Sequence, residues 1–456
     1  MHPMFRSRLP VTRRGWVIAL YLAAALVLGG GGSPSALPEM LIQLAFAAGV
    51  LTWALWARGP LDGRGLPREL VWLAALPIVL CALQLIPLPP AVWHALPGRG
   101  LEVRALGLVD AADSWRPLSI APLRTLAALL AIVPACALML GVAQLGHRDR
   151  RAVLLVIAAT GLAGAVLGAL QLAGQGAVFR PYKISHAPWL TGFYANRNSA
   201  ADAFLIAMLA LGAWALQGSL AAARARDRLV PLAAAFLLLT TALVLTGSRA
   251  GIALFAIVLP ILLVMARDRL PAVVRRRRVV AGAAGLAALA VLGPLVLQAV
   301  PRLGEVAARF AVSGDARPQL WADSWYVARQ FWPSGSGIGT FAAAFLPFEP
   351  LDRVDATVPS RAHFDYLEVV IEAGLAGVAG MVLAAVLAIR LVLRAARNAT
   401  VLRPVLLFAV GTLLVTALHS LVDYPLRSMA IASLVAAALG MLAAPAQADK
   451  NTGSRQ

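Results

Sequence analysis

The chain of 456 residues contains twelve apolar runs, each long enough to cross a membrane as a helix. About 20 helical residues span the ~30 Å hydrocarbon core of a bilayer. The runs lie at about 15–32, 40–57, 70–88, 125–145, 152–172, 199–217, 229–246, 250–266, 279–300, 364–389, 403–421 and 427–445. Because the bilayer offers no water to unpaired backbone groups, such runs fold as helices. The sequence therefore predicts an all-α polytopic membrane bundle of about twelve helices, forming one membrane domain over residues 1–456.

The charged residues predict the side of the membrane on which each loop lies. If the N-terminus is cytoplasmic and the sides alternate, the cytoplasmic segments hold 25 basic and six acidic residues, and the outer segments hold 15 of each. Short cytoplasmic loops of membrane proteins carry such an excess of Lys and Arg. We therefore predict that both termini are cytoplasmic. The net charge of +19 marks topology and contact with anionic lipid rather than nucleic-acid binding.

The N-terminal segment and the cysteines have simple interpretations. Arg6, Arg8 and two further arginines precede the first apolar run, as in a signal peptide, but the many later spans favour a retained signal-anchor helix. Cys81 and Cys136 lie inside apolar runs and are expected to be small apolar fillers. The spacing of His, Cys, Asp and Glu predicts no metal site.

The longest outer segment, residues 301–362, contains too many aromatic residues for a disordered linker and predicts a folded lid. Residues 318–332 predict an amphipathic helix on the membrane surface, with an aromatic stripe containing Trp321, Trp325 and Trp332 toward lipid and the bundle core. The glycines of Ser334–Gly339 follow directly. They favour a flexible turn over a phosphate-binding loop, since no lysine follows them.

His363 lies where this segment enters the tenth run and is the candidate general base, because neutral imidazole accepts protons near pH 7. Arg361, Asp365 and Glu368 flank it and could orient it. The alternative is an ordinary polar residue at a helix mouth.

Asp365, Glu368 and Glu372 form one acidic stripe on the predicted tenth helix. Ion pairing with a neighbouring helix and a role in steering His363 or binding an acceptor are both open. Farther along the chain, His419 and Asp423 have i, i+4 spacing, which favours a structural hydrogen-bonded pair over a catalytic dyad.

Several outer arginines are either snorkelling side chains or an anion site, because guanidinium groups bind phosphate in a bidentate manner. They are Arg249 at the tip of a tight helical hairpin, Arg317 and Arg361. Asn196 and Asn198 flank Arg197 before the sixth run, and at least one of the two asparagines is expected to cap that helix.

Six short motifs in this order resemble those of the O-antigen ligase and O-antigen polymerase superfamily of bacterial envelope glycan enzymes. They are Gly192–Ala200, Leu245–Gly251, Arg317–Trp321, Trp332–Phe341, Ala362–Gly374 and His419–Asp423. The resemblance covers roughly residues 190–430. Phe364 stands where the family commonly has Asn, which puts the acceptor preference in question.

The resemblance implies a glycosyltransferase C-type fold in the bacterial inner membrane, with the active site facing the periplasm. It implies a metal-independent, inverting enzyme without a cofactor that moves a glycan from undecaprenyl diphosphate to an acceptor hydroxyl. In this scheme His363 is the base, and Arg249, Arg317 and Arg361 bind the diphosphate. Arg197, Asn196, Asn198, Asp365, Glu368, Glu372, His419 and Asp423 are secondary candidates.

The resemblance narrowly favours a ligase that uses lipid A–core as acceptor. A polymerase that extends a growing glycan is the first alternative, and a polysaccharide transporter or flippase is the second. Transport predicts charges at the bilayer midplane and paired broken helices. The sequence places most charges at the ends of the predicted spans, with Glu372 as the main exception.

Overall fold

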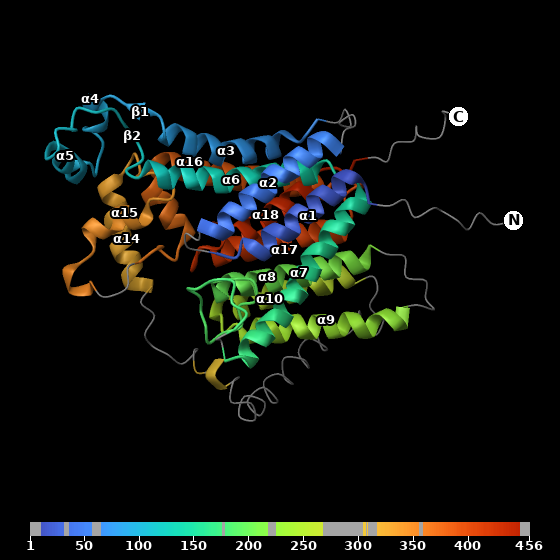
Figure 1. Ribbon diagram of the computed structural model, residues 1–456. Coiled ribbons are helices and arrows are strands. Elements are labelled where there is room, and N and C mark those ends of the chain that lie inside the picture. Colours follow the sequence, from blue (N-terminus) through green and yellow to red (C-terminus); the bar gives the residue numbers. More distant parts are fainter. Residues whose placement is uncertain are drawn as a thin grey trace.

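The computed structural model is almost entirely helical (Figure 1). It describes residues 11–31, 36–56, 65–175, 178–217, 225–267, 304–306, 308, 317–354 and 359–446. Eleven helices overlap the predicted runs. They are α1 (Arg13–Leu28), α2 (Ala36–Trp56), α3 (Arg68–Gln84), α6 (Pro122–Ala143), α7 (His147–Ala173), α8 (Arg197–Leu216), α9 (Ala225–Leu245), α10 (Arg249–Ala266), α16 (Asp365–Ala396), α17 (Arg403–His419) and α18 (Met429–Met441). The predicted ninth run, 279–300, lies outside the described residues, as do both extreme termini.

Six of the described helices are long and apolar enough to cross a membrane: α2, α6, α7, α8, α10 and α16. Three shorter apolar helices accompany them, at Leu229–Leu245, Arg403–His419 and Met429–Met441. The prediction of an all-α polytopic membrane protein is therefore confirmed.

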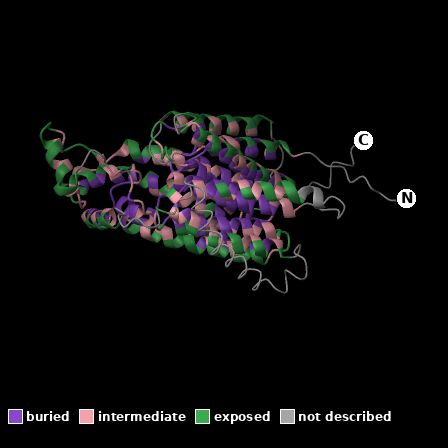
Figure 2. Ribbon diagram, turned by 90° about the horizontal axis from the view of Figure 1, so that it is seen from below, coloured by how far each residue is buried: buried purple, intermediate pink, exposed green. Residues whose placement is uncertain are grey.

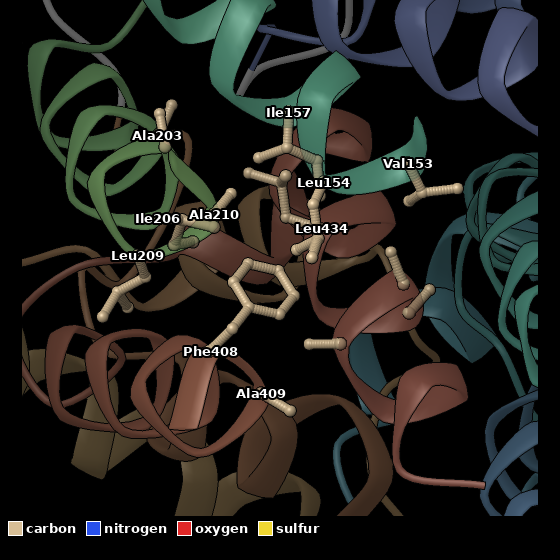
Figure 3. Close-up of a cluster of buried hydrophobic side chains, with 14 of the residues drawn as sticks. Val153, Leu154, Ile157, Ala203, Ile206, Leu209, Ala210, Phe408, Ala409 and Leu434 are labelled. Atoms are coloured by element: carbon tan, nitrogen blue, oxygen red, sulfur yellow. The ribbon is translucent and has the colours of Figure 1, made fainter. Parts of the chain in front are cut away.

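The core of the bundle surrounds α8. Nearly all of α8 is buried, whereas in α2 Ile42 is buried and the other described side chains are half-buried or exposed. Buried side chains occupy the interior of the bundle and exposed ones its outside (Figure 2). Phe408 of α17 packs between small and branched residues of α7, α8 and α18 (Figure 3). The close packing gives α8 a fixed position, which matters because the candidate residues Asn196, Arg197 and Asn198 lie at its start.

The smaller elements gather at one end of the bundle, which we call the motif end (Figure 1). They are β1 (Pro87–Leu88), α4 (Pro90–Trp93), α5 (Gly100–Gly107), β2 (Arg116–Pro117), α14 (Arg317–Phe331), α15 (Phe341–Phe345), and the 3-10 helices η2 (Leu346–Phe348), η3 (Leu351–Arg353) and η4 (Pro425–Arg427). β1 and β2 pair antiparallel.

The predicted amphipathic helix at 318–332 is present as α14, but its buried face is not the predicted aromatic stripe. Ser324, Val327 and Phe331 are buried, and Trp325 and Trp332 are about half exposed. Val327, Ala328 and Phe331 of this face share one buried cluster with Leu367 and Ile371 of α16. Of the predicted stripe, Trp321 contacts the neighbouring loop, where it packs against Phe364.

The Gly335–Gly339 turn is packed into a break in α16 rather than flexible. Gly374 has φ +52°, so the helix is interrupted there and the carbonyl groups of Ile371 and Glu372 lose their helical partners. The amides of Ser336 and Gly337 donate to these carbonyls at 3.0 and 2.8 Å. A Cβ at Gly335 would lie 2.6 Å from the carbonyl oxygen of Glu372, so the turn requires glycine there. The turn and the broken helix satisfy each other's backbone groups.

Candidate active site

The central feature of the candidate site is a hydrogen bond between His363 and Asp423. His363 Nδ1 lies 2.8 Å from Asp423 Oδ1. His363 stands two residues before α16, and Asp423 lies in the turn between α17 and α18. The histidine side chain is 32% exposed and the aspartate is 2% exposed. Because Asp423 holds Nδ1, the second ring nitrogen, Nε2, is the one that can accept a proton from a ligand.

The backbone at His363 holds an unusual conformation. Its φ is +51°, in the left-handed region that few side chains adopt. The indole Nε1 of Trp321 donates to the His363 carbonyl at 3.3 Å, and the next amide but one, Asp365 N, donates to Ser420 O at 3.0 Å. The Tyr424 ring packs edge-on against the imidazole at a centroid distance of 4.8 Å. Strained residues held in this way by their surroundings cluster at functional sites.

Asp423 is ionised at physiological pH. Burial alone would raise the pKa of its carboxyl group, but the hydrogen bond from His363 and the charges of His419 and His363 lower the pKa to about 2. Asn196 also donates to the carboxylate, with Nδ2 3.3 Å from Oδ2. A fixed negative charge at Nδ1 favours the imidazole tautomer that has its free lone pair on Nε2.

The predicted pairing of His419 with Asp423 is wrong. His419 Nδ1 instead lies 2.6 Å from Asp202 Oδ1 of α8, and both side chains are buried. His419 is the last residue of α17, and the chain leaves the helix after it. Asp423 therefore does not lie on the helix face four residues after His419 and points to His363 instead.

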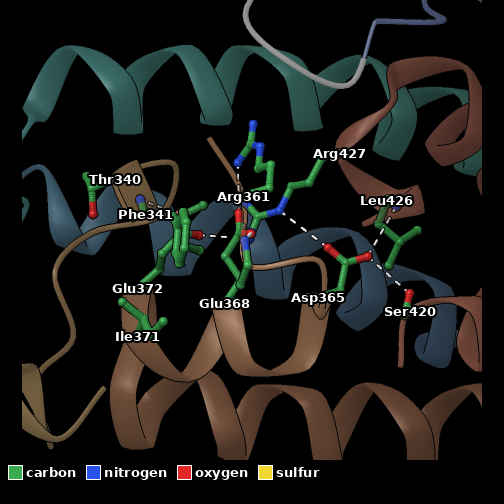
Figure 4. Close-up of polar contacts among 12 residues, drawn as sticks. Thr340, Phe341, Arg361, Asp365, Glu368, Ile371, Glu372, Ser420, Leu426 and Arg427 are labelled. Atoms are coloured by element: carbon green, nitrogen blue, oxygen red, sulfur yellow. Dashed lines mark hydrogen bonds and ion pairs between the residues drawn. The ribbon is translucent and has the colours of Figure 1, made fainter. Parts of the chain in front are cut away.

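The acidic stripe of α16 surrounds one arginine that sequence reasoning did not single out (Figure 4). Arg427 of η4 lies 2.8 Å from Glu372, 3.2 Å from Glu368 and 3.5 Å from Asp365. Arg361 contacts Glu368 at 2.8 Å. Burial would lower the pKa of Arg427, but the three carboxylates raise it, so its guanidinium group stays charged. Of the two readings of the stripe, the structure shows ion pairing, although the partner belongs to a short 3-10 helix.

Arg361, Asp365 and Glu368, which the sequence suggests could orient His363, make their side-chain contacts elsewhere, and Asp423 holds the imidazole. Their side chains are held by Arg427, by each other, or by Ser420, whose hydroxyl donates to Asp365 at 3.0 Å. A carboxylate on the same helix as a cation has many possible partners, and sequence spacing does not show which one it takes. Arg427 itself gave one weak signal, as a basic residue at the outer end of the twelfth predicted run.

The Asn-x-Asn motif (Asn196–Asn198) and the Ser-Arg motif (Ser248–Arg249) meet beside the His363–Asp423 pair. Asn196 caps α8 by accepting a hydrogen bond from the amide of Asn198 at 2.9 Å, as predicted. Ser248 caps α10 and donates through its hydroxyl to Asn198 Oδ1 at 2.8 Å. Arg249, the first residue of α10, therefore follows directly on a residue that is linked through Asn198 and Asn196 to Asp423. The guanidinium carbon of Arg197 lies over the Trp189 ring at 5.4 Å.

The remaining candidate arginine, Arg317, begins α14 and is partly buried. It is close enough to His419 for the two groups to interact electrostatically. Arg317 and Arg249, from distant parts of the sequence, therefore both belong to the motif end, with His363. Within the described residues, no three His, Cys, Asp or Glu side chains form a group that could hold a metal ion.

Replacing Asp423 with Asn tests the role assigned to this carboxylate. The amide keeps the size of the side chain but offers a donor to Nδ1, which favours the tautomer that carries its proton on Nε2. We expect activity to fall by at least about 10²-fold, because a base in the wrong tautomer cannot accept the proton. The pH–rate profile of the variant, measured with the purified protein, should lose its acidic limb, which is the rise in rate as a general base loses its proton. Asp323→Asn, which removes the partner of exposed Arg353, is the matched control and should leave activity unchanged. An unchanged rate and profile in Asp423→Asn would contradict this role.

No curated protein matches the chain. Residues 234–382 match a family model described as O-Antigen ligase. The match runs from α9 through α10 and α14 to the middle of α16, and so includes Arg249, Arg317 and His363. Over residues 234–382, this multi-pass membrane chain is therefore similar to the O-antigen ligase family.

Proposed function

We propose that this protein transfers a glycan from undecaprenyl diphosphate to an acceptor hydroxyl on the periplasmic face of the bacterial inner membrane. The acceptor we favour is lipid A–core, which makes the protein an O-antigen ligase. The observation that carries the proposal is the 2.8 Å contact between the half-buried His363 and the ionised, buried Asp423. This pair has the composition of a general base with its orienting carboxylate.

In the proposed reaction, His363 Nε2 takes the proton of the acceptor hydroxyl as its oxygen attacks the anomeric carbon of the donor. The bond between that carbon and the phosphate oxygen breaks, and its electron pair leaves on the diphosphate. A single displacement of this kind inverts the anomeric configuration. Arg249 and Arg317 bind the departing diphosphate, where negative charge develops in the transition state.

The role proposed for Arg249 and Arg317 predicts that the loss of either guanidinium group slows the chemical step. Arg249→Gln and Arg317→Gln should each lower kcat by about 10²–10³-fold, because each removes a donor that stabilises the leaving group. Lysine at either position should restore part of the rate, since it keeps the charge but not the bidentate geometry. Arg329→Gln removes an exposed charge from the last turn of α14 and serves as the control. Full activity in both glutamine variants would rule out diphosphate binding by these arginines.

Arg361 is proposed to act less directly than the other two arginines. Its guanidinium group is held by Glu368 at 2.8 Å, so part of its charge is already compensated. We infer that Arg361 supports the loop before His363 and contributes to the anion site mainly through its long-range field. Asn196, Asn198 and Asp365 hold the motifs together, and Arg197, beside Trp189, borders the same corner.

The acceptor is tested in a strain from which the gene has been deleted. Loss of capped lipopolysaccharide on a gel, with long carrier-linked polymer retained, identifies a ligase. Single repeat units on the core identify a repeat-unit polymerase instead. Phe364, which packs against Trp321 at a centroid distance of 5.6 Å, is the position where acceptor preference should differ from that of relatives with Asn.

A further inference from the structure

A second polar site lies at the end of the bundle opposite to the motif end. A cavity of about 560 Å³ opens between the last turns of α16 and the first turn of α3. It shares Glu69, Arg390 and Arg394 with a second cavity of about 700 Å³ that follows the same two helices. Together they form a groove of the size that ligand-binding sites in proteins have.

The α16 wall of this groove changes from apolar to cationic along one stripe. Leu383 and Leu387 line its inner part, followed at i+3 or i+4 spacing by Arg390, Arg394 and Arg397. The opposite wall repeats the pattern, because Trp72 and Arg68 of α3 have i, i+4 spacing. Both helices therefore present apolar side chains toward the middle of the bundle and guanidinium groups at its end.

The charge in the groove is strongly positive. Four arginines and one acidic residue, Glu69, line it. Arg394 lies 3.4 Å from Glu69, and the other three guanidinium groups have no ion pair or hydrogen bond with described residues. Trp72 is 59% exposed and Leu383 is 43% exposed, so the apolar part of the groove is open to the bilayer. A ligand that fits both parts must have an anionic head and an apolar tail.

We propose that this groove binds an anionic phospholipid of the leaflet opposite to the active site. The phosphate lies among Arg68, Arg390 and Arg394, and the acyl chains lie along Trp72, Leu383 and Leu387. Basic pockets between membrane helices recognise lipid headgroups in this way. The groove is not the donor site of the proposed reaction, because Leu375 and Arg394, on the unbroken part of α16 after Gly374, are already separated by roughly 29 Å at 1.5 Å per residue. The site is independent of the proposed catalytic function.

The test uses the purified full-length protein in a zwitterionic detergent. Its thermal unfolding midpoint is measured while phosphatidylglycerol, phosphatidylcholine or inorganic phosphate is added. We expect phosphatidylglycerol alone to raise the midpoint of the wild-type protein, since a ligand that binds only the folded state stabilises it. In the double variant Arg390→Gln/Arg394→Gln, apparent affinity for phosphatidylglycerol should fall at least about tenfold, because two cationic contacts are lost.

The matched control is Arg148→Gln/Arg151→Gln, which removes two charges at the start of α7, outside the groove. It should respond to phosphatidylglycerol like the wild type. An equal response in the groove variant and the wild type would overturn the proposal, as would an equal loss in the control. If inorganic phosphate stabilises the protein as well as phosphatidylglycerol does, the ligand is a soluble anion and the lipid proposal is wrong. If the double arginine variant fails to fold, Leu383→Gln replaces it. This substitution keeps all charges of the groove, and it should weaken the binding of phosphatidylglycerol without changing the response to inorganic phosphate.

Discussion

Replacing His363 with Asn is expected to reduce glycan transfer by about 10²–10⁴-fold while leaving the protein folded. Asparagine tolerates the left-handed backbone conformation that this position requires, with φ +51°. It can also donate a hydrogen bond to Asp423, but it cannot accept the proton of an acceptor hydroxyl. The loss should appear in kcat, because the interaction is made only as the proton moves. The measurement is the transfer rate of purified variants, with the thermal unfolding midpoint as the check on folding.

His147 provides the matched control for this experiment. It lies in the first turn of α7, at the opposite end of the bundle from His363, and has no part in the proposed reaction. His147→Asn should keep wild-type transfer. If His363→Asn retains full transfer, another group is the base and the roles given to His363 and Asp423 both fail. His363→Ala should lose as much activity, but it leaves Asp423 without its partner and so combines two effects.

Replacing Arg427 with Gln is expected to have the largest effect on stability, about 3–5 kcal/mol. This arginine is the common partner of Asp365, Glu368 and Glu372, all of which are buried. Removing one member of a buried charge cluster leaves the remaining charges uncompensated, which costs far more than the loss of an exposed ion pair. Circular dichroism of the detergent-purified variant as a function of temperature measures the change.

The same substitution should also lower transfer, because η4 begins two residues after Asp423 in the chain. Arg427 ties this segment to α16, which begins two residues after His363. Arg427→Lys should recover most of the stability and part of the activity, because it keeps the charge. Arg353→Gln breaks the exposed ion pair with Asp323 at the same end and should cost at most about 1 kcal/mol. A thermal midpoint of Arg427→Gln that matches that of Arg353→Gln would show that the cluster contributes little.

The sequence predicts the helices well because their cause is local. A run of 20 apolar residues has few alternatives in a membrane, so eleven of the twelve predicted runs correspond to described helices. The cap at Asn196 is also local, since its side chain bonds the amide only two residues away. In the same way, Pro318 and the helical spacing that follows predict α14 to within a residue or two at each end.

The partners of charged side chains could not be predicted, because they come from distant parts of the chain. His363 bonds Asp423, 60 residues later, and His419 bonds Asp202, 217 residues earlier. The i, i+4 rule connects His419 to Asp423 only while the helix continues, and α17 ends at His419. The packing of the Gly335–Gly339 turn against α16 could not be predicted either. The turn and the helix break at Gly374 satisfy each other's backbone groups, and neither segment alone reveals this pairing in the sequence.

If the protein itself catalyses glycan transfer with His363 as base, the purified protein needs no partner for the reaction. The most direct test is transfer by the purified protein in detergent micelles, with a carrier-linked glycan as donor and lipid A–core as acceptor. We expect glycosylated acceptor and free undecaprenyl diphosphate in equal amounts with the wild type, and neither product above background with His363→Asn. Movement of carrier-linked glycan across sealed vesicles, with no product in micelles, would instead identify the protein as a transporter.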